Sequence, residues 1–299
     1  MSRLTIDVEY LAHMLQRMLE TPSPSGYTDT IVRLICEELD RLGVEYELTR
    51  RGAIRARLAG AESKGARALI AHLDTLGALV KNLKDNGRLE VVPIGQWSSR
   101  FAEGARCTLF TEKGSYRGSI LSLKASGHTY NEEVDTHPIG WEHVELRVDA
   151  LARNRLELER LGVAIGDTIA IDTRSEFLPN GFIVSRHLDD KAGCAAMLAA
   201  LKALVEEGRR LPVDAFFIFS ISEEVGVGAS SVLTQDVASM VTIDNGTTAP
   251  GEASGRVWGH HRDGRPDRAV RLSPDEEAYP ALPRKRHRLR AGRVSLLSR

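Results

Sequence analysis

Four short segments of this 299-residue chain carry histidine or carboxylate side chains where buried strands are expected to end. In chain order, the segments hold His72 and Asp74, Asp189 and Asp190, Glu223 and Glu224, and Asp244. Open α/β sheets bind their ligands at the carboxyl ends of the strands, so we expect these side chains to meet at one edge of a sheet. Imidazole nitrogens and carboxylate oxygens bind zinc-like ions, and the pattern therefore predicts metal-assisted chemistry.

The first two segments each have a simpler interpretation when taken alone. Residues two apart in an extended chain face the same side, so His72 and Asp74 project together and the carboxylate can fix the imidazole tautomer. A histidine at a strand end is nevertheless more often only hydrogen-bonded. Asp189 and Asp190 open a helix, where capping is sufficient to explain both acids. A carboxylate can also bridge two cations, which capping does not require.

The last two segments are equally open when taken alone. Glu223 and Glu224 directly follow an apolar strand and face opposite directions, so one can bind a metal ion while the other acts as general base toward water. The alternative is a solvated turn. Asp244 is followed by Asn and Gly, and Asp-Asn-Gly is a common turn sequence.

The elements that must position these residues alternate between helix and strand. Apolar residues recur at helical spacing in the helices and form short buried runs in the strands. We predict helices over residues 7–19, 28–42, 191–205 and 229–237, and strands over 45–48, 53–58, 68–71, 181–184, 213–221 and 240–243.

The stretch over residues 78–179 differs from the rest of the chain, because short strands follow one another there. It predicts strands over residues 88–94, 106–110, 116–121, 142–148 and 167–171, with one charged helix over 154–161. A block of short strands inside an alternating chain indicates an inserted β domain. The predicted organisation is a discontinuous α/β domain over residues 1–77 and 180–250, a β domain over 78–179, and an anomalous tail over 251–299.

The four segments together are far more specific than any one of them. Their order is His-x-Asp, a long insertion, Asp-Asp, Glu-Glu and then Asp. With the blocks TPSPSG, AHLDTLG, HLDDKAG, SEEVGVGAS and TIDNGT, this closely resembles the co-catalytic metallopeptidases of the glutamyl-aminopeptidase (deblocking, tetrahedral or TET) family over about residues 1–250. The insertion, with KASGHTYNEEVDT, looks closest to the branch linked to an N-acetylated glutamine-dipeptide osmoprotectant.

The resemblance implies a role for each site residue. His72, Asp189 and Asp244 would hold one divalent ion, and Asp189 would bridge to a second ion that Glu224 also binds. Glu223 would be the general base, and Asp74 would orient His72. Zinc or cobalt, or else manganese, is the expected metal, and peptides with a free N-terminus are the expected substrates.

The resemblance also implies an architecture. It is a three-layer α/β/α metallopeptidase domain with an inserted β-barrel that helps to assemble dimers into a dodecamer. The first residues lack the apolar core of a signal peptide, and Cys36, Cys107 and Cys194 form no ligand pattern. Core thiols in a reducing compartment explain the cysteines, so we expect a cytoplasmic protein without a membrane span.

The tail departs from the family pattern. From Gly251 onward the chain holds 12 Lys and Arg against 6 Asp and Glu, with Pro266, Pro274, Pro280 and Pro283 interrupting any periodicity. The family supplies a last metal-binding histidine from this region, and nothing in this tail resembles that segment. We therefore expect a poorly ordered tail, an uncovered sheet edge and a second metal site without its histidine.

A shifted translation frame explains the composition of the tail. Codons allowed for Val257 onward, when read one nucleotide later, give a strand-like start and a helix with Leu and Ile at helical spacing, which resembles the family's next segment. A nucleic-acid-binding tail is the alternative, because residues 284–290 form a basic cluster. That cluster lacks interleaved aromatic residues, and we favour the frameshift.

Two other functions stay open at this point. A related metal-dependent deacylase or carboxypeptidase is one, although those enzymes place a small insertion after the Glu-Glu block, whereas the long insertion here precedes Asp189. A non-catalytic assembly subunit is the other. The sequence predicts a metalloaminopeptidase, with the activity of the truncated chain open.

Overall fold

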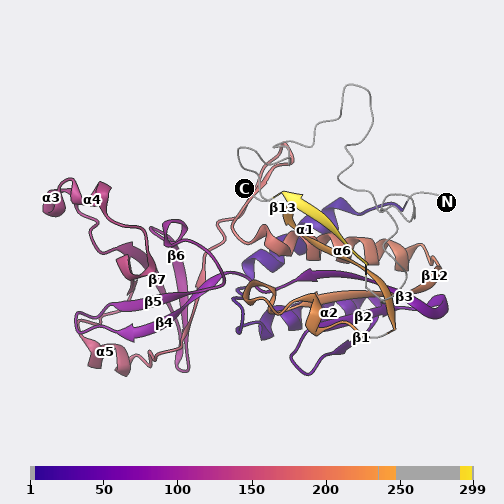
Figure 1. Cartoon of the computed structure of the whole chain (residues 1–299), viewed down its shortest axis with the longest axis horizontal. Coiled ribbons are helices and arrows are strands. Elements are labelled where there is room, and N and C mark those ends of the chain that lie inside the picture. Colours follow the sequence, from indigo (N-terminus) through magenta and orange to yellow (C-terminus); the bar gives the residue numbers. More distant parts are fainter. Residues whose placement is uncertain (1–3, 235, 247–289, 298–299) are drawn as a thin grey trace, which may run out of the picture.

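The computed structural model describes residues 4–234, 236–246 and 290–297 of the chain. It consists of an α/β body and a β-barrel, which lie side by side in Figure 1. The chain enters the barrel after β3 of the body and returns to the body before helix α6. This confirms the α/β fold with an inserted barrel.

The body is built on a six-stranded sheet. The strands β12, β3, β13 and β14 are mutually parallel, whereas β1 and β2 pair in antiparallel fashion at the other side of β12. In spatial order the strands are β1 (Glu45–Leu48), β2 (Ile54–Leu58), β12 (Leu211–Ser220), β3 (Gly60–His72), β13 (Val237–Gly246) and β14 (Arg290–Leu297). The carboxyl ends of the central parallel strands therefore lie at one edge, as the site prediction requires.

Three long helices share one core with this sheet: α1 (Val8–Glu20), α2 (Asp29–Leu42) and α6 (Leu188–Glu206). Asp7 begins α1 by accepting a hydrogen bond from the N–H of Tyr10 at 2.9 Å, which satisfies a free amide of the first turn. Gly43 ends α2 with a φ of 67°, a left-handed conformation that suits glycine.

The buried residues of β12 alternate between the two faces of the sheet. Phe217 and Phe219 pack against the helices, while Phe216 and Ile218 belong to a second cluster on the opposite face. That cluster takes Val232 from the segment after β12 rather than residues of a helix. A second helical layer, which the three-layer prediction includes, is not among the described residues.

The insertion forms a closed six-stranded barrel with its own core. It closes because β9 pairs with β4 through Ile169 and Ala78. In order around the barrel the strands are β4 (Gly77–Leu83), β5 (Leu89–Ile94), β8 (Val144–Val148), β7 (Gly114–Ser122), β6 (Arg106–Thr111) and β9 (Thr168–Ile171). Its short helices are α3 (Gly127–Tyr130), α4 (Glu133–Thr136) and α5 (Arg155–Arg160).

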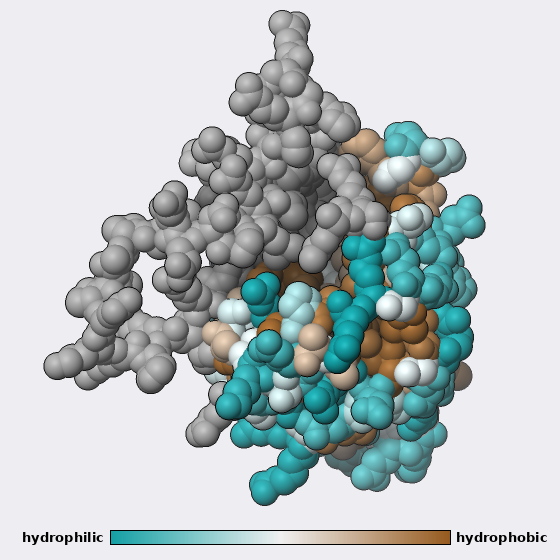
Figure 2. All heavy atoms as spheres, turned by 90° about the vertical axis from the view of Figure 1, so that its right-hand side faces the viewer, coloured by the Kyte–Doolittle hydropathy of each residue, from teal (hydrophilic) through white to brown (hydrophobic). Residues whose placement is uncertain are grey.

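A small hairpin of β10 (Glu176–Phe177) and β11 (Ile183–Val184) leads from the barrel back to α6. The predicted strand over residues 181–184 is thus part of a separate two-stranded sheet. Figure 2 views the end of the body that lies away from the barrel, where most of the visible coloured surface is hydrophilic. None of the helices within residues 4–234 and 236–246 has the length and apolar character needed to span a membrane.

Two sequence predictions are wrong. The segment over residues 229–237 is not a helix: only Ala229–Ser231 makes a 3₁₀ turn, and β13 begins at Val237 because its residues pair with β3. The tail was also expected to leave the edge at β13 uncovered, yet β14 pairs with β13 from Ser239 to Gly246. The free edge of a parallel strand is a template for any available extended segment, which explains this pairing.

Candidate metal centre

His72 is the last residue of β3, and its imidazole is buried. The Nδ1 atom lies 2.8 Å from the main-chain carbonyl oxygen of Asp74, which can only accept, so Nδ1 carries the proton. The Nε2 atom lies 3.1 Å from Oδ1 of Asp189 and 3.8 Å from Oε2 of Glu223. In the neutral ring, the lone pair of Nε2 therefore faces carboxylates.

Asp189 stands at the start of α6, before the regular helical turns. Its ψ of 111° is extended rather than helical, and the peptide bond to Asp190 is cis. Its Oδ2 atom accepts a hydrogen bond from Nδ2 of Asn245, near the end of β13. Its Oδ1 atom faces His72, so one carboxylate connects β13 and β3.

The glutamates lie in a 3₁₀ turn, Glu223–Val225, that follows β12. The side chain of Asp74 is fully buried and accepts from both of their main-chain amides, with Glu223 N–H to Oδ1 at 3.1 Å and Glu224 N–H to Oδ2 at 3.2 Å. Asp74 thus holds the turn, in addition to placing its carbonyl oxygen against His72. The sequence predicted only the contact with His72.

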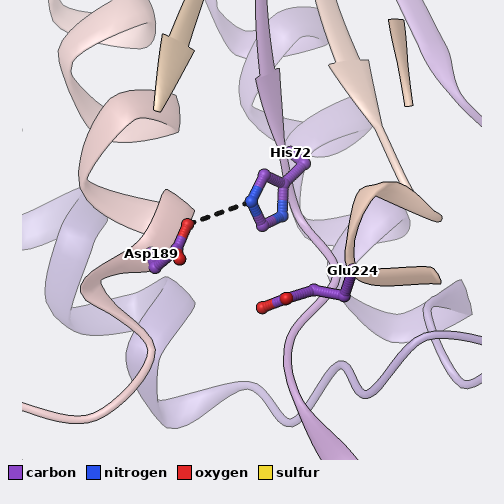
Figure 3. Close-up of side chains that lie close together, drawn as sticks. All are labelled: His72, Asp189 and Glu224. Atoms are coloured by element: carbon purple, nitrogen blue, oxygen red, sulfur yellow. Dashed lines mark hydrogen bonds and ion pairs between the residues drawn. The ribbon is translucent and has the colours of Figure 1, made fainter. Parts of the chain in front are cut away.

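Three of these side chains converge in Figure 3. One ligand atom from each of His72, Asp189 and Glu224 lies within 4.8 Å of the others. The three come from the end of β3, the start of α6 and the turn after β12, which confirms that the strand ends meet at one place. Asp244 is not a member of this group among the described residues.

Asp244 nevertheless belongs to the same edge of the sheet. It lies in β13 two positions beyond Thr242, whose partner on β3 is Ile70, two positions before His72. Its negative charge helps to raise the pKa of Glu223, although burial of Glu223 has the larger effect.

Asp190 and Asn245 are site residues that the sequence interpretation missed. Asp190, considered there only as a possible helix cap, is buried, and its Oδ2 accepts the main-chain N–H of His72 at 3.2 Å. Its neighbour Gly193 leaves room for it, since a Cβ on Gly193 would lie 2.2 Å from Oδ1 of Asp190. Asp190 lies in the block HLDDKAG and Asn245 in the block TIDNGT, and these blocks were the available sequence signal.

Burial at this site disfavours the charged forms of its carboxylates. Burial, with help from neighbouring carboxylates, raises the pKa of Asp190 to about 8 and that of Glu224 to about 7. Burial opposes protonation of His72, but hydrogen bonds to Asp189 and Asp74 outweigh it and raise the pKa of His72 well above its usual value. A cation bound at Nε2 would take the place of this proton, so the site suits a divalent metal ion.

Lys191 does not supply a positive charge to these carboxylates. Its side chain is fully buried, and Nζ donates to the carbonyl oxygens of Met18 and Thr21 at the C-terminal end of α1, both at 2.8 Å. Burial lowers the pKa of this amine to about 7. Lys191 therefore ties the start of α6 to α1 rather than neutralising the carboxylates.

The barrel reaches the same region. A Cβ on Gly95, which follows β5, would lie 3.2 Å from the carbonyl oxygen of Glu224 and 2.5 Å from a methyl carbon of Leu76. Gly95 also has a φ of 80°, so the close approach and the backbone both favour glycine here. The loop after β5 thus lies close to the turn that carries Glu224.

The chain is similar to known proteins in sequence and in fold. The profile of the M42 glutamyl aminopeptidase family matches residues 52–264. The chain is 34% identical to the putative aminopeptidase YhfE of Bacillus subtilis, over 81% of this chain and 70% of the relative. It is 30% identical to the lysyl aminopeptidase of Pyrococcus furiosus, over 73% of this chain and 61% of that relative.

The fold is similar to that of the TET1 peptidase of Pyrococcus horikoshii, with a TM-score of 0.72 at 24% identity over 83% of this chain and 72% of the other. The family profile and two curated relatives agree on hydrolases that act on peptides. The chain therefore belongs to the M42 glutamyl aminopeptidase family.

Proposed function

We propose that this chain is a metal-dependent aminopeptidase whose metal centre is built on His72, Asp189 and Glu224. The observation that carries the proposal is the convergence of one imidazole nitrogen and two carboxylate oxygens within 4.8 Å, at a place where burial raises the pKa of Glu224. Such a donor set matches those of catalytic zinc sites, which combine histidine with carboxylates.

The proposal includes two divalent ions, zinc or cobalt, or else manganese. His72, Asp189 and Asp244 are proposed for one ion, and Asp189 and Glu224 for the other. Support comes from Asp189, whose oxygens face two different strands, and from Asp244 on the same edge of the sheet. Such ions polarise a peptide carbonyl and lower the pKa of water.

Glu223 is the proposed general base. Its Oε2 lies 3.8 Å from Nε2 of His72, and its side chain is 42% exposed, so a water molecule can reach it. Burial raises its pKa, which suits a group that takes a proton from the attacking water and returns it to the leaving amine. Asp74 fixes the position of Glu223 through its main-chain amide.

Peptides with a free N-terminus are the proposed substrates, and a homo-oligomer is the proposed assembly. The Pyrococcus horikoshii TET1 peptidase can assemble into a tetrahedron or a large octahedral shell. By analogy we propose dimers that assemble into a dodecamer, with a cytoplasmic location. Membership of the osmoprotectant-linked branch stays a prediction.

The proposed second ion has an incomplete set of ligands, because no segment after Asp244 resembles the one from which the family supplies its last histidine. His260, His261 and His287 of the tail lie outside the described residues, in sequence without a pattern. We propose that the chain as written binds this ion weakly and is inactive or nearly so. This shortage is the observation that favours the alternative, a non-catalytic assembly subunit. No comparable observation favours a deacylase or carboxypeptidase.

Metal content and hydrolysis test the proposal together. Purified chain, dialysed against zinc or cobalt and analysed by plasma mass spectrometry, should retain at least one equivalent per chain. Retention of none would support the assembly subunit. Rapid cleavage of aminoacyl-p-nitroanilides by the chain as written would overturn the inactivity that we propose.

A further inference from the structure

The carboxylate of Asp74 has one partner that comes from outside the site described above. Its Oδ1 accepts from Glu223 N–H and its Oδ2 from Glu224 N–H. Oδ2 also accepts from the hydroxyl of Ser25 at 2.5 Å, the shortest of the three hydrogen bonds. Ser25 lies in the turn between α1 and α2, about fifty positions before Asp74. A hydroxyl group of a remote turn is thus part of the support of both glutamates.

The turn that carries Ser25 is paired with the chain on both sides of Asp74. The hydroxyl of Ser23 donates to the carbonyl oxygen of Leu73 at 2.7 Å. Thr75 N–H donates to the carbonyl of Ser23 at 2.9 Å, and Ser25 N–H donates to the carbonyl of Thr75 at 3.2 Å. The two main-chain hydrogen bonds with Thr75 fix the main chain of Ser25, so its hydroxyl is held against Asp74.

The same turn is also anchored to the barrel. The ring of Tyr27 stacks on the ring of Phe110 in β6, with centroids 4.3 Å apart and planes 20° apart. Tyr27 N–H donates to the carbonyl of Pro24 at 2.7 Å, which connects the stacked ring to the turn. Body and barrel therefore both hold the segment that presents Ser25.

We propose that Ser25 is a positioning residue of the metal centre, acting through the carboxylate of Asp74 on the turn that carries Glu223 and Glu224. Asp74 is fully buried, so bulk solvent does not replace a lost hydroxyl partner directly. Without that partner the carboxylate rotates, and both main-chain amides that depend on it lose their anchor. The carboxylate of Glu224 then leaves the position where it meets His72 and Asp189.

This inference rests on the proposed function, because it concerns ligands of the proposed metal. It makes a prediction of its own, namely that the affinity for metal depends on a hydroxyl group that touches no ligand atom. Loss of a residue that supports metal ligands without binding the metal itself typically weakens metal affinity about 10–100-fold.

The test compares Ser25→Ala with Ser25→Thr and Ser23→Ala in the full chain. Ser25→Thr keeps the hydroxyl, whereas Ser23→Ala removes a buried hydroxyl of the same turn that does not bond to Asp74. Co²⁺ is titrated into each protein by calorimetry, and the visible absorption of the bound Co²⁺ is recorded. We expect Ser25→Ala to bind Co²⁺ about 10-fold more weakly with an altered spectrum, and the other two to stay within about threefold of wild type.

The possible outcomes separate the two proposals. Wild type that binds no Co²⁺ contradicts the proposed function. Wild type that binds Co²⁺ together with an unchanged Ser25→Ala overturns the role of Ser25 alone, as does an equal loss of affinity in Ser23→Ala. If Ser25→Ala does not fold, Ser25→Cys replaces it, because a thiol keeps the volume but donates weakly.

Discussion

The Nε2 atom of His72 lies 3.1 Å from Oδ1 of Asp189, although 117 positions of the chain separate the two residues. The whole barrel, from Gly77 to Ile171, lies between them in the sequence. The insertion thus leaves the body at the end of β3 and returns at the start of α6, beside its point of departure. One part of the insertion, Gly95 after β5, comes close to the turn that carries Glu224.

The adjacent glutamates provide a matched pair of substitutions. We expect Glu224→Gln to weaken the binding of Co²⁺ or Zn²⁺ by more than about 10-fold, since a proposed ligand contributes at least as much as a residue that only supports the ligands. Glu223→Gln should change the affinity by less than about threefold, because the proposed role of Glu223 is proton transfer. Isothermal titration of both variants measures the difference. Equal losses in the two variants would show that the roles are assigned wrongly.

Lys191→Met should destabilise the fold. The variant keeps the length of the side chain but leaves the carbonyl of Thr21 without its buried donor, which costs about 1–3 kcal/mol. Chemical denaturation measures the loss. Lys202→Met is the control on the same helix, because its amine makes ion pairs with Asp7 and Glu206 at the surface. A Lys191→Met protein as stable as Lys202→Met would contradict the structural role of this amine.

Gly193→Ala should destabilise the chain and disturb the site. The added Cβ would lie 2.2 Å from Oδ1 of Asp190 and 2.8 Å from a methyl carbon of Ile243, and such overpacking costs about 1–3 kcal/mol. Gly127→Ala serves as the control, because nothing lies within 4 Å of a Cβ at that position. The thermal midpoints of the two variants should therefore differ, and equal midpoints would argue against the tight contact.

Much of the site could be predicted because its residues follow buried strands. His72 and Glu223 come after apolar runs that pack on both faces of the sheet, and parallel strands place their ends at one edge. Asp190 and Ser25 could not be assigned in this way. Their contacts depend on how α6 and the first turn pack against β3, and neither a helix-capping position nor a serine in a turn carries a distinctive signal.

The errors in the elements also have physical causes. Residues 229–237 were expected to form a helix, but Ala229–Ser231 forms only a 3₁₀ turn and Val237 pairs with Ala66 as the first residue of β13. The arginine-rich stretch around β14 shows no clear periodicity, and its pairing is provided by the free edge of β13. Tertiary partners that are distant in the sequence decided both cases.

The frameshift hypothesis makes a prediction about the nucleotide sequence of the gene. Reading the gene one nucleotide later after the codon of Arg256 should give an open frame that continues with family-like sequence to a histidine. The chain with that frame restored should hydrolyse aminoacyl-p-nitroanilides, and Glu223→Gln in it should lower kcat about 10²–10⁴-fold. Early stop codons in the shifted frame would contradict the frameshift and leave the tail unexplained.

The most direct measurement is a calorimetric titration of the metal-free chain and its His72→Ala variant with Zn²⁺. We expect wild type to bind at least one ion, and the variant to bind it at least about 100-fold more weakly, because the only imidazole of the described ligand group is lost. Zinc binding of equal strength in both proteins would place the ion elsewhere and contradict the metal centre.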